Sequence, residues 1–344
     1  MEDQSYDSFS YDLPKNPIRL RHYMRHRSVK PRSVKPSTVE RPQHVSMPPS
    51  PSFSSASVSS SPSALSPSLS VATPLTTPAV SVASNAIEKK LAVPLPSLSE
   101  SNTITALFEN QAAVRPNAPA IYGWDRGFTY GQLNAYANRL AGRLVKEGVK
   151  KGDMVPVCFE KSAWYFVAIT AVNKAGGAWV PLDPASPNAR SLQVVQQAQA
   201  KIALSSPSNT AKCAKLVGSV LEVSERADKE LQKEYSGENG PNVKVAASDA
   251  VYVLFTSGST GTPKGLVMEH GAVAASQTAI GERMGMTPDV RMLQFAAFVF
   301  DLSIGEIVGP LIHGACICVP REEDRLGNLP AFIRDSKATW TYLT

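Results

Sequence analysis

The stretch LFTSGSTGTPKG, from Leu254 to Gly265, places hydroxyl and glycine residues directly after an apolar run. A strand that enters such a loop presents backbone N–H groups and hydroxyls toward one concave point, which suits phosphate oxygens. Lys264 adds a positive charge beside the loop. The stretch therefore predicts a phosphate-binding loop at the end of a strand.

Two common phosphate loops do not fit this stretch. A Walker loop has glycine directly before its lysine and serine or threonine directly after it. Here Pro263 precedes Lys264 and Gly265 follows it. A dinucleotide-binding loop needs the spacing G-x-G-x-x-G, which Gly258 and Gly261 do not supply. Neither loop type explains the stretch.

The segments around the loop alternate between helix and strand patterns. Apolar residues at helical spacing predict helices at 103–115, 131–147, 163–175, 188–199, 208–217, 271–285, 302–314 and 329–337. Short apolar or alternating runs predict strands at 119–124, 128–130, 154–160, 178–182, 201–206, 250–256, 265–270, 291–297, 315–320 and 338–344. This order predicts an α/β fold with largely parallel sheets covered by helices. The polar segment 222–247 is expected to be a surface insertion.

Composition indicates a protein without a membrane span. The 344 residues are 43% hydrophobic, but no uncharged apolar run approaches the roughly 18 residues of a membrane helix. The N-terminus has no apolar block of the kind found in secretory signals. The cysteines lack the paired spacing of a zinc site and have apolar neighbours: Cys158, Cys213, Cys316 and Cys318. We expect buried thiols in a reducing, cytoplasmic compartment and no metal held by cysteine.

The net charge of +6 belongs mainly to the N-terminal region. Residues 1–100 contain 11 of the 35 Lys and Arg but only 7 of the 29 Asp and Glu. Eight basic residues lie within 15–35, and no charged residue occurs in the Ser- and Pro-rich segment 42–87. Such a region cannot bury enough apolar surface to offset its ordering entropy, so residues 1–98 are predicted to be a disordered tail. A solvated tail is the simplest interpretation, and we expect no nucleic-acid partner.

Further motifs identify a family. TSGSTGTPKG matches the phosphate loop of the acyl-adenylate-forming superfamily, also called the AMP-dependent synthetases and ligases. KAGGAWVPLDP (174–184), FTYGQLN (128–134) and FDLS (300–303) resemble motifs of adenylation domains in nonribosomal peptide synthetases. Gln132 stands where this family usually has glutamate, and LVMEH after the loop resembles the fungal enzymes. Residues 99–344 are therefore identified as the N-terminal part of the large domain of such an adenylation domain.

The resemblance implies ATP-dependent activation of an amino acid as an aminoacyl-adenylate, with Mg²⁺ bridging phosphate oxygens, in secondary metabolite biosynthesis. It assigns the ATP phosphates and leaving pyrophosphate to Thr256, Ser257, Gly258, Ser259, Thr260, Gly261 and Lys264. It assigns the α-ammonium of the substrate to Asp301, and the side-chain pocket to Leu302 and Gly305. Taken alone, Asp301 would be interpreted as a helix N-cap.

The family's other motifs would lie beyond Thr344. They are a Tyr-Gly-Pro-Thr-Glu segment, a ribose-binding Asp, a hinge and a small C-terminal domain with the catalytic Lys, so we expect no catalytic residue or metal ligand here. We expect a truncated piece without independent activity. Its partners would be the amino acid and the synthetase's condensation and carrier domains, with phosphopantetheine on the carrier.

Two other functions remain open on the sequence alone. An acyl-CoA or aryl-acid ligase of the same superfamily shares the phosphate loop, but Asp301 and KAGGAWVPLDP argue against it. A non-catalytic remnant or scaffold that acts through its basic tail belongs to a different class of function.

Overall fold

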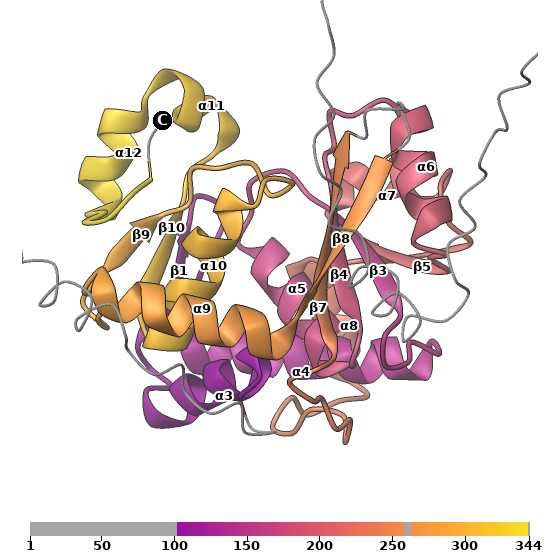
Figure 1. Cartoon of the computed structure of the whole chain (residues 1–344), viewed down its shortest axis with the longest axis horizontal. Coiled ribbons are helices and arrows are strands. Elements are labelled where there is room, and N and C mark those ends of the chain that lie inside the picture. Colours follow the sequence, from indigo (N-terminus) through magenta and orange to yellow (C-terminus); the bar gives the residue numbers. More distant parts are fainter. Residues whose placement is uncertain (1–101, 258–262, 343–344) are drawn as a thin grey trace, which may run out of the picture. The chain divides into compact units, whose positions relative to one another are not determined.

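Two sheets organise the described part of the chain (Figure 1). The computed structural model describes residues 102–257 and 263–342, which belong to the compact unit Pro94–Thr344. The predicted tail, residues 1–98, lies outside the described residues.

The four-stranded sheet has the order β2-β1-β10-β9. Strands β1 and β2 are antiparallel, whereas β1, β10 and β9 are parallel, with Ile121 opposite Ile317 and Ile317 opposite Met292. This sheet combines segments from both ends of the described chain. Its strands are β1 (Pro119–Gly123), β2 (Gly127–Thr129), β9 (Arg291–Leu293) and β10 (Cys316–Val319).

The six-stranded sheet has the order β6-β5-β3-β4-β7-β8. All its pairs are parallel except β7 with β8, which form an antiparallel hairpin at one edge. Its strands are β3 (Met154–Cys158), β4 (Ala178–Leu182), β5 (Ile202–Ser205), β6 (Ser219–Glu222), β7 (Ala250–Ser257) and β8 (Pro263–Glu269). The expectation of largely parallel sheets is confirmed.

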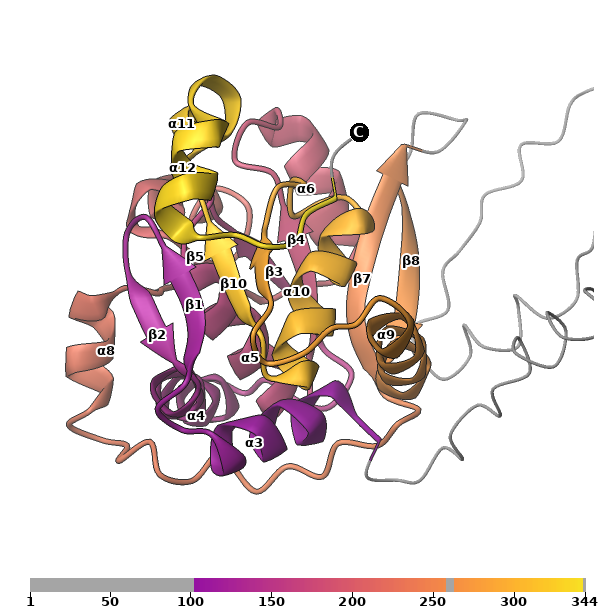
Figure 2. The ribbon, with the colours of Figure 1, turned by 90° about the vertical axis from the view of Figure 1, so that its left-hand side faces the viewer.

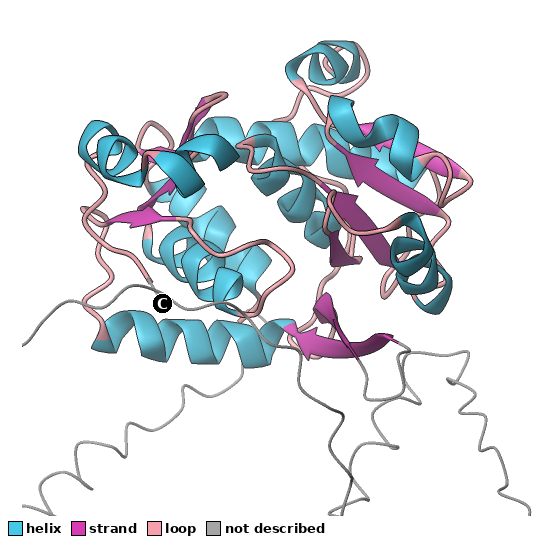
Figure 3. Ribbon diagram, turned by 90° about the horizontal axis from the view of Figure 1, so that it is seen from above, coloured by secondary structure: helices cyan, strands magenta, loops and turns pink. Residues whose placement is uncertain are grey.

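Helices separate the two sheets and cover them (Figure 3). Helix α5 lies between the sheets and is buried along nearly its whole length, which explains its apolar sequence. Figure 2 shows α10 between β10 and α9. The helices are α3 (Ile104–Val114), α4 (Tyr130–Lys146), α5 (Trp164–Lys174), α6 (Asn188–Gln197), α7 (Thr210–Cys213), α8 (Glu225–Leu231), α9 (His270–Arg283), α10 (Leu302–His313), α11 (Glu322–Gly327) and α12 (Leu329–Ser336), with a 3₁₀ turn, η1, at Pro207–Asn209. None of the helices in the described ranges combines the length and apolar character that a membrane crossing requires.

Helix α4 shows how local sequence sets an element. The Thr129 hydroxyl accepts a hydrogen bond from the Gln132 N–H at 3.2 Å, and the Gln132 side chain accepts one from the Thr129 N–H at 3.0 Å. This capping box works with glutamine as it does with glutamate, so the departure from the family motif leaves the cap intact. The helix ends before Gly148, whose φ of +92° suits a residue without a Cβ.

The segment predicted as a surface insertion, 222–247, is anchored more firmly than expected. Strand β6 was not predicted and extends to Glu222, and α8 packs against α4. The Arg139 guanidinium donates to both carboxylate oxygens of Asp228 at 2.7 and 2.8 Å, and both side chains are buried. A bidentate pair of this kind ties the polar segment to the core.

Three other predicted elements are shorter than expected, and two short helices, α8 and α11, were not predicted. The helix at 208–217 is only η1 and α7, and the strand at 291–297 pairs only over Arg291–Leu293. The strand at 338–344 is reduced to a single bridge between Met292 and Trp340, with residues 343–344 outside the described range. Helix α11 was not predicted, because its charged segment has no apolar periodicity.

Candidate functional site

The β7–β8 hairpin carries the predicted phosphate loop. Thr256 pairs with Lys264 and Ser257 with Pro263, so the ladder holds both arms in register up to the loop. The side chains of Thr256 and Lys264 are exposed, and the Thr256 hydroxyl donates to the Lys264 carbonyl at 3.5 Å. The other predicted loop residues, Gly258, Ser259, Thr260 and Gly261, lie outside the described residues.

Gly265 allows this hairpin to close. A Cβ at this position would lie 3.1 Å from side-chain atoms of both Phe255 and Val253. Such contacts are tighter than most Cβ contacts, so a side chain after Lys264 would have to displace Phe255 and Val253 by a few tenths of an ångström. The motif's last residue therefore has a structural role.

The carboxyl ends of parallel strands place further polar residues at the edge where β7 meets the loop. Glu160 follows β3, Asp183 follows β4 and Ser206 follows β5. The Glu160 carboxylate accepts hydrogen bonds from Ser206 Oγ at 2.7 Å and Asn209 Nδ2 at 2.7 Å. Ligands of open α/β sheets bind outside this edge. Here Glu160 holds the turn after β5, at the same edge of the sheet at which β7 ends.

Asp301 stands at the N-terminus of α10, where its carboxylate accepts a hydrogen bond from the Leu302 N–H at 2.8 Å. Both interpretations of this residue assumed that a helix follows it, and the cap is present. Its side chain is exposed, as is that of Leu302. The contact with a substrate ammonium stays a prediction.

Gly305 lies one helical turn beyond Asp301 and leaves space next to α10. A Cβ there would lie 3.7 Å from the Tyr342 hydroxyl and 3.9 Å from Gln277 Oε1, both ordinary contact distances. Tyr342 and Gln277 were not singled out from the sequence. Only the three-dimensional packing brings them to Gly305.

Tyr252 links the Asp301 region to the phosphate-loop strand. This tyrosine lies in β7, is 6% exposed and packs against Trp179 with ring centroids 5.3 Å apart. Burial raises the pKa of Tyr252 to about 12, and the negative charge of Asp301 contributes to that rise.

A buried polar cluster behind Asp301 was also missed. Lys161, Gln294 and Glu306 are 5%, 0% and 0% exposed and are linked by hydrogen bonds. In the sequence, Gln294 and Glu306 each interrupt an apolar run, in RMLQFAA and SIGEIVGPL. The sequence signal for this cluster was a polar residue inside a segment predicted to lie in the core.

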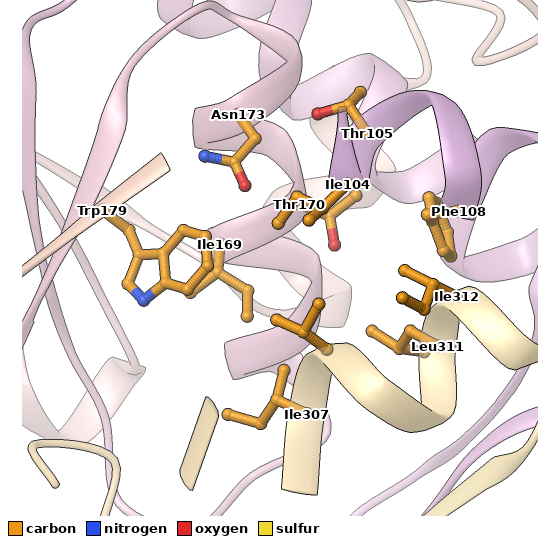
Figure 4. A pocket seen from close by; sticks show the side chains of 11 residues that line it. Ile104, Thr105, Phe108, Ile169, Thr170, Asn173, Trp179, Ile307, Leu311 and Ile312 are labelled. Atoms are coloured by element: carbon orange, nitrogen blue, oxygen red, sulfur yellow. The ribbon is translucent and has the colours of Figure 1, made fainter. Parts of the chain in front are cut away.

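Two cavities among the described residues lie away from Asp301 and Lys264. An apolar cavity of about 30 Å³ lies where α3, α5, β4 and α10 meet (Figure 4). A polar hollow of about 270 Å³ is lined by α3 residues, Lys174 and the segment 240–245. Neither is lined by Asp301 or Lys264, so we treat both as features of packing. Within the described residues, no group of three His, Cys, Asp or Glu side chains is arranged to hold a metal ion.

Comparison with known proteins identifies the family. The AMP-binding enzyme family matches residues 108–344. The chain belongs to the AMP-binding enzyme family. The match confirms the prediction from the motifs and makes the chain part of an adenylate-forming ligase.

Fungal relatives of this AMP-binding chain are large synthetases. It is 45% identical over 249 residues to the nonribosomal peptide synthetase TES of Alternaria alternata, covering 72% of this chain and 5% of that protein. It is 41% identical to the bassianolide nonribosomal cyclodepsipeptide synthetase of Beauveria bassiana, covering 67% of this chain and 7% of that protein. The chain thus spans a small part of the length of these relatives.

Similar solved structures agree with the family assignment. The nonribosomal peptide synthetase FmoA3, in a form bound to alpha-methyl-L-serine-AMP, is 29% identical with a TM-score of 0.62, covering 72% of this chain and 27% of that one. VinN is 18% identical with a TM-score of 0.64, covering 71% of this chain and 62% of that one, and this likeness concerns the fold alone.

Proposed function

We propose that this chain binds an amino acid through its α-ammonium at Asp301 and the phosphates of ATP at the loop after β7. It would do so as part of an adenylation domain that activates the amino acid as an aminoacyl-adenylate. The observation that supports the proposal is the family match over residues 108–344, which contain both predicted binding groups. The Asp301 carboxylate is exposed at the start of α10, and the Lys264 side chain is exposed where the β7–β8 ladder meets the predicted loop.

The chemistry divides into tasks for these residues. A substrate carboxylate attacks the α-phosphate of ATP and pyrophosphate leaves, so the site must hold negative charge on both groups. Lys264 and the backbone N–H groups of the loop would hold the β- and γ-phosphates, and Asp301 would hold the ammonium. Mg²⁺ would come with the nucleotide, and we assign no ligand for it in this chain.

The wider setting belongs to the same proposal. The synthetase relatives support condensation and carrier domains as partners, with phosphopantetheine on the carrier. We place the activity in the cytoplasm. All four cysteines are free, buried thiols, as expected for a reducing compartment.

Amino-acid binding separates the proposal from an aryl-acid or acyl-CoA ligase. The purified chain is titrated calorimetrically with the proteinogenic amino acids and with deaminated analogues of each. We expect one amino acid or a small group to bind, and the matched analogues without the amine to bind at least tenfold more weakly. A charge-assisted hydrogen bond contributes about 1.5–3 kcal/mol, which corresponds to roughly tenfold to a hundredfold in Kd.

Two variants separate the proposed role of Asp301 in binding the substrate ammonium from its role as the N-cap of α10. Asp301→Asn keeps an oxygen that can accept from the Leu302 N–H and removes the charge, whereas Asp301→Ala removes both. We expect both variants to lose amino-acid affinity, and only Asp301→Ala to lose about 0.5–1 kcal/mol of unfolding free energy. Wild-type affinity in Asp301→Asn, or equal binding of amino acids and deaminated analogues, would refute the proposal.

A further inference from the structure

The connection between β9 and α10, residues 294–301, ends at Asp301 and has no regular secondary structure. Its backbone makes few hydrogen bonds to other backbone groups. The Gln294 N–H donates to the Cys318 carbonyl at 2.9 Å, and the Phe300 N–H donates to the Ala297 carbonyl at 3.0 Å. The conformation of this loop therefore depends on side chains from elsewhere in the fold.

Lys161 supplies the donors for the first part of the loop. It follows the end of β3 and is 5% exposed. Its ammonium donates to Gln294 Oε1 at 2.5 Å, to the Ala296 carbonyl at 2.5 Å and to the Phe295 carbonyl at 3.2 Å. An ammonium carries three N–H donors. All three have acceptors in the loop, and the acceptors lie more than 130 residues along the chain.

Glu306 supplies the matching acceptor from α10. Its carboxylate is fully buried and accepts from the Ala296 N–H at 3.0 Å and from Gln294 Nε2 at 2.9 Å. Gln294 Nε2 also donates to the Ala296 carbonyl at 2.7 Å. Gln294 thus lies between the two charged groups. Glu306 holds the Ala296 N–H, and Lys161 holds the Ala296 carbonyl.

The two charges stabilise each other in a buried site. Burial lowers the pKa of Lys161 and Glu306 raises it, while burial raises the pKa of Glu306 and Lys161 lowers it. Arg325 and Glu322 of α11 also act on Lys161, in opposite directions. Buried charges of this kind contribute little net stability compared with apolar side chains, and their best-supported benefit is a unique arrangement.

We propose that Lys161 is a positioning residue for amino-acid recognition: with Gln294 and Glu306, it holds the loop 294–301 so that Asp301 faces the substrate ammonium. The proposal rests on the function proposed above for Asp301. Lys161 acts through the loop and makes no contact with substrate. Misplacement of the Asp301 carboxylate would cost its charge-assisted hydrogen bond to the ammonium, which corresponds to roughly tenfold to a hundredfold in Kd.

Hydrogen–deuterium exchange of peptides that cover 294–304 tests the positioning directly in the full chain. We expect Lys161→Met to increase exchange of these amides while β3, β4 and β7 keep wild-type protection. Lys174→Met is the matched control. Lys174 is also buried and paired with a carboxylate, that of Glu109, but it lies beside the Phe108 ring of α3 and not beside the loop. Its loss should leave exchange at 294–304 unchanged.

Amino-acid affinity supplies the second measurement. We expect Lys161→Met to raise the Kd by roughly tenfold to a hundredfold, and Lys174→Met to leave it within about twofold. The double variant Lys161→Met/Glu306→Gln leaves no uncompensated buried charge. It should therefore regain thermal stability relative to Lys161→Met without regaining affinity, a separation that a purely structural role would not produce.

The two proposals fail by different results. A wild-type chain that binds no amino acid would refute the proposed function, whatever Lys161 does to the loop. Wild-type exchange at 294–304 in a folded Lys161→Met variant would refute the positioning role, as would affinity that returns with stability in the double variant.

Discussion

His270, the first residue of α9, should make the chain sensitive to mild acid. Its ring is 1% exposed, and neither ring nitrogen has a hydrogen-bond partner among the described residues. Burial lowers the pKa of His270 from 6.5 to about 4, although the Asp249 carboxylate acts in the opposite direction. The folded chain therefore keeps this ring neutral, whereas the unfolded chain protonates it near its ordinary pKa.

The sign and size of the effect follow from these two pKa values. Between about pH 6.5 and pH 4 the unfolded state binds more protons, so the contribution of His270 to the free energy of unfolding falls as the pH falls. Above about pH 6.5 the contribution is constant. A difference of about 2.5 pKa units corresponds to about 3 kcal/mol across the whole window, most of it lost by about pH 4.5.

Urea unfolding at pH 4.5 to 8, followed by circular dichroism, measures the pH dependence of the free energy of unfolding. His270→Gln removes the titrating group, so its stability should fall less on acidification than that of the wild type, by about 2.5 kcal/mol between pH 7.5 and pH 4.5. The absolute stability of the variant does not matter, because only the difference between pH values is compared. Wild-type and variant curves that stay parallel across this range would show that His270 is not buried in its neutral form.

Four further substitutions test the packing. Arg139→Met or Asp228→Asn should each lower the unfolding free energy by about 3–5 kcal/mol, and the double variant by much less than the sum, in a urea-denaturation cycle. Gly265→Ala should destabilise by about 1 kcal/mol, although alanine for glycine in a strand normally stabilises, and a raised Tm would contradict the crowding at this position. Val308→Ile, which points a methyl at the 30 Å³ cavity, should raise stability by up to about 0.7 kcal/mol; a loss would mean that the cavity cannot accept the group.

Local sequence signals predicted most elements of the fold. Strand β4 has the predicted bounds, and α4 has both its capping residues and its terminal glycine in the sequence. Strand β6 was missed because it is half-buried and pairs only with β5, so its apolar alternation is weak. The predicted strand at 291–297 was too long for a different reason: beyond Leu293, side chains replace strand partners.

The candidate site shows the same difference between local sequence signals and contacts that join distant segments. Thr256, Lys264 and Asp301 could be proposed from contiguous motifs, because each lies within a short run with a recognisable pattern. Glu306 stands out only as a polar residue in an apolar run, and its link to Lys161 could not be predicted, because that link exists only when β3 and α10 are brought together around the loop. A motif shows which groups are available for chemistry, whereas the groups that hold them in place are dispersed along the chain.

The four-stranded sheet imposes an order on how this protein can be made. The six-stranded sheet is built from consecutive segments between β3 and β8 and can begin to form as soon as they leave the ribosome. Strands β1 and β2 emerge earlier, but β1 must pair with β10, which is synthesised after all of them. Until then the first hairpin has an unpaired edge, which is a template for incorrect strand pairing. The part of the domain that is synthesised first therefore has to be kept from incorrect strand pairing for the longest time.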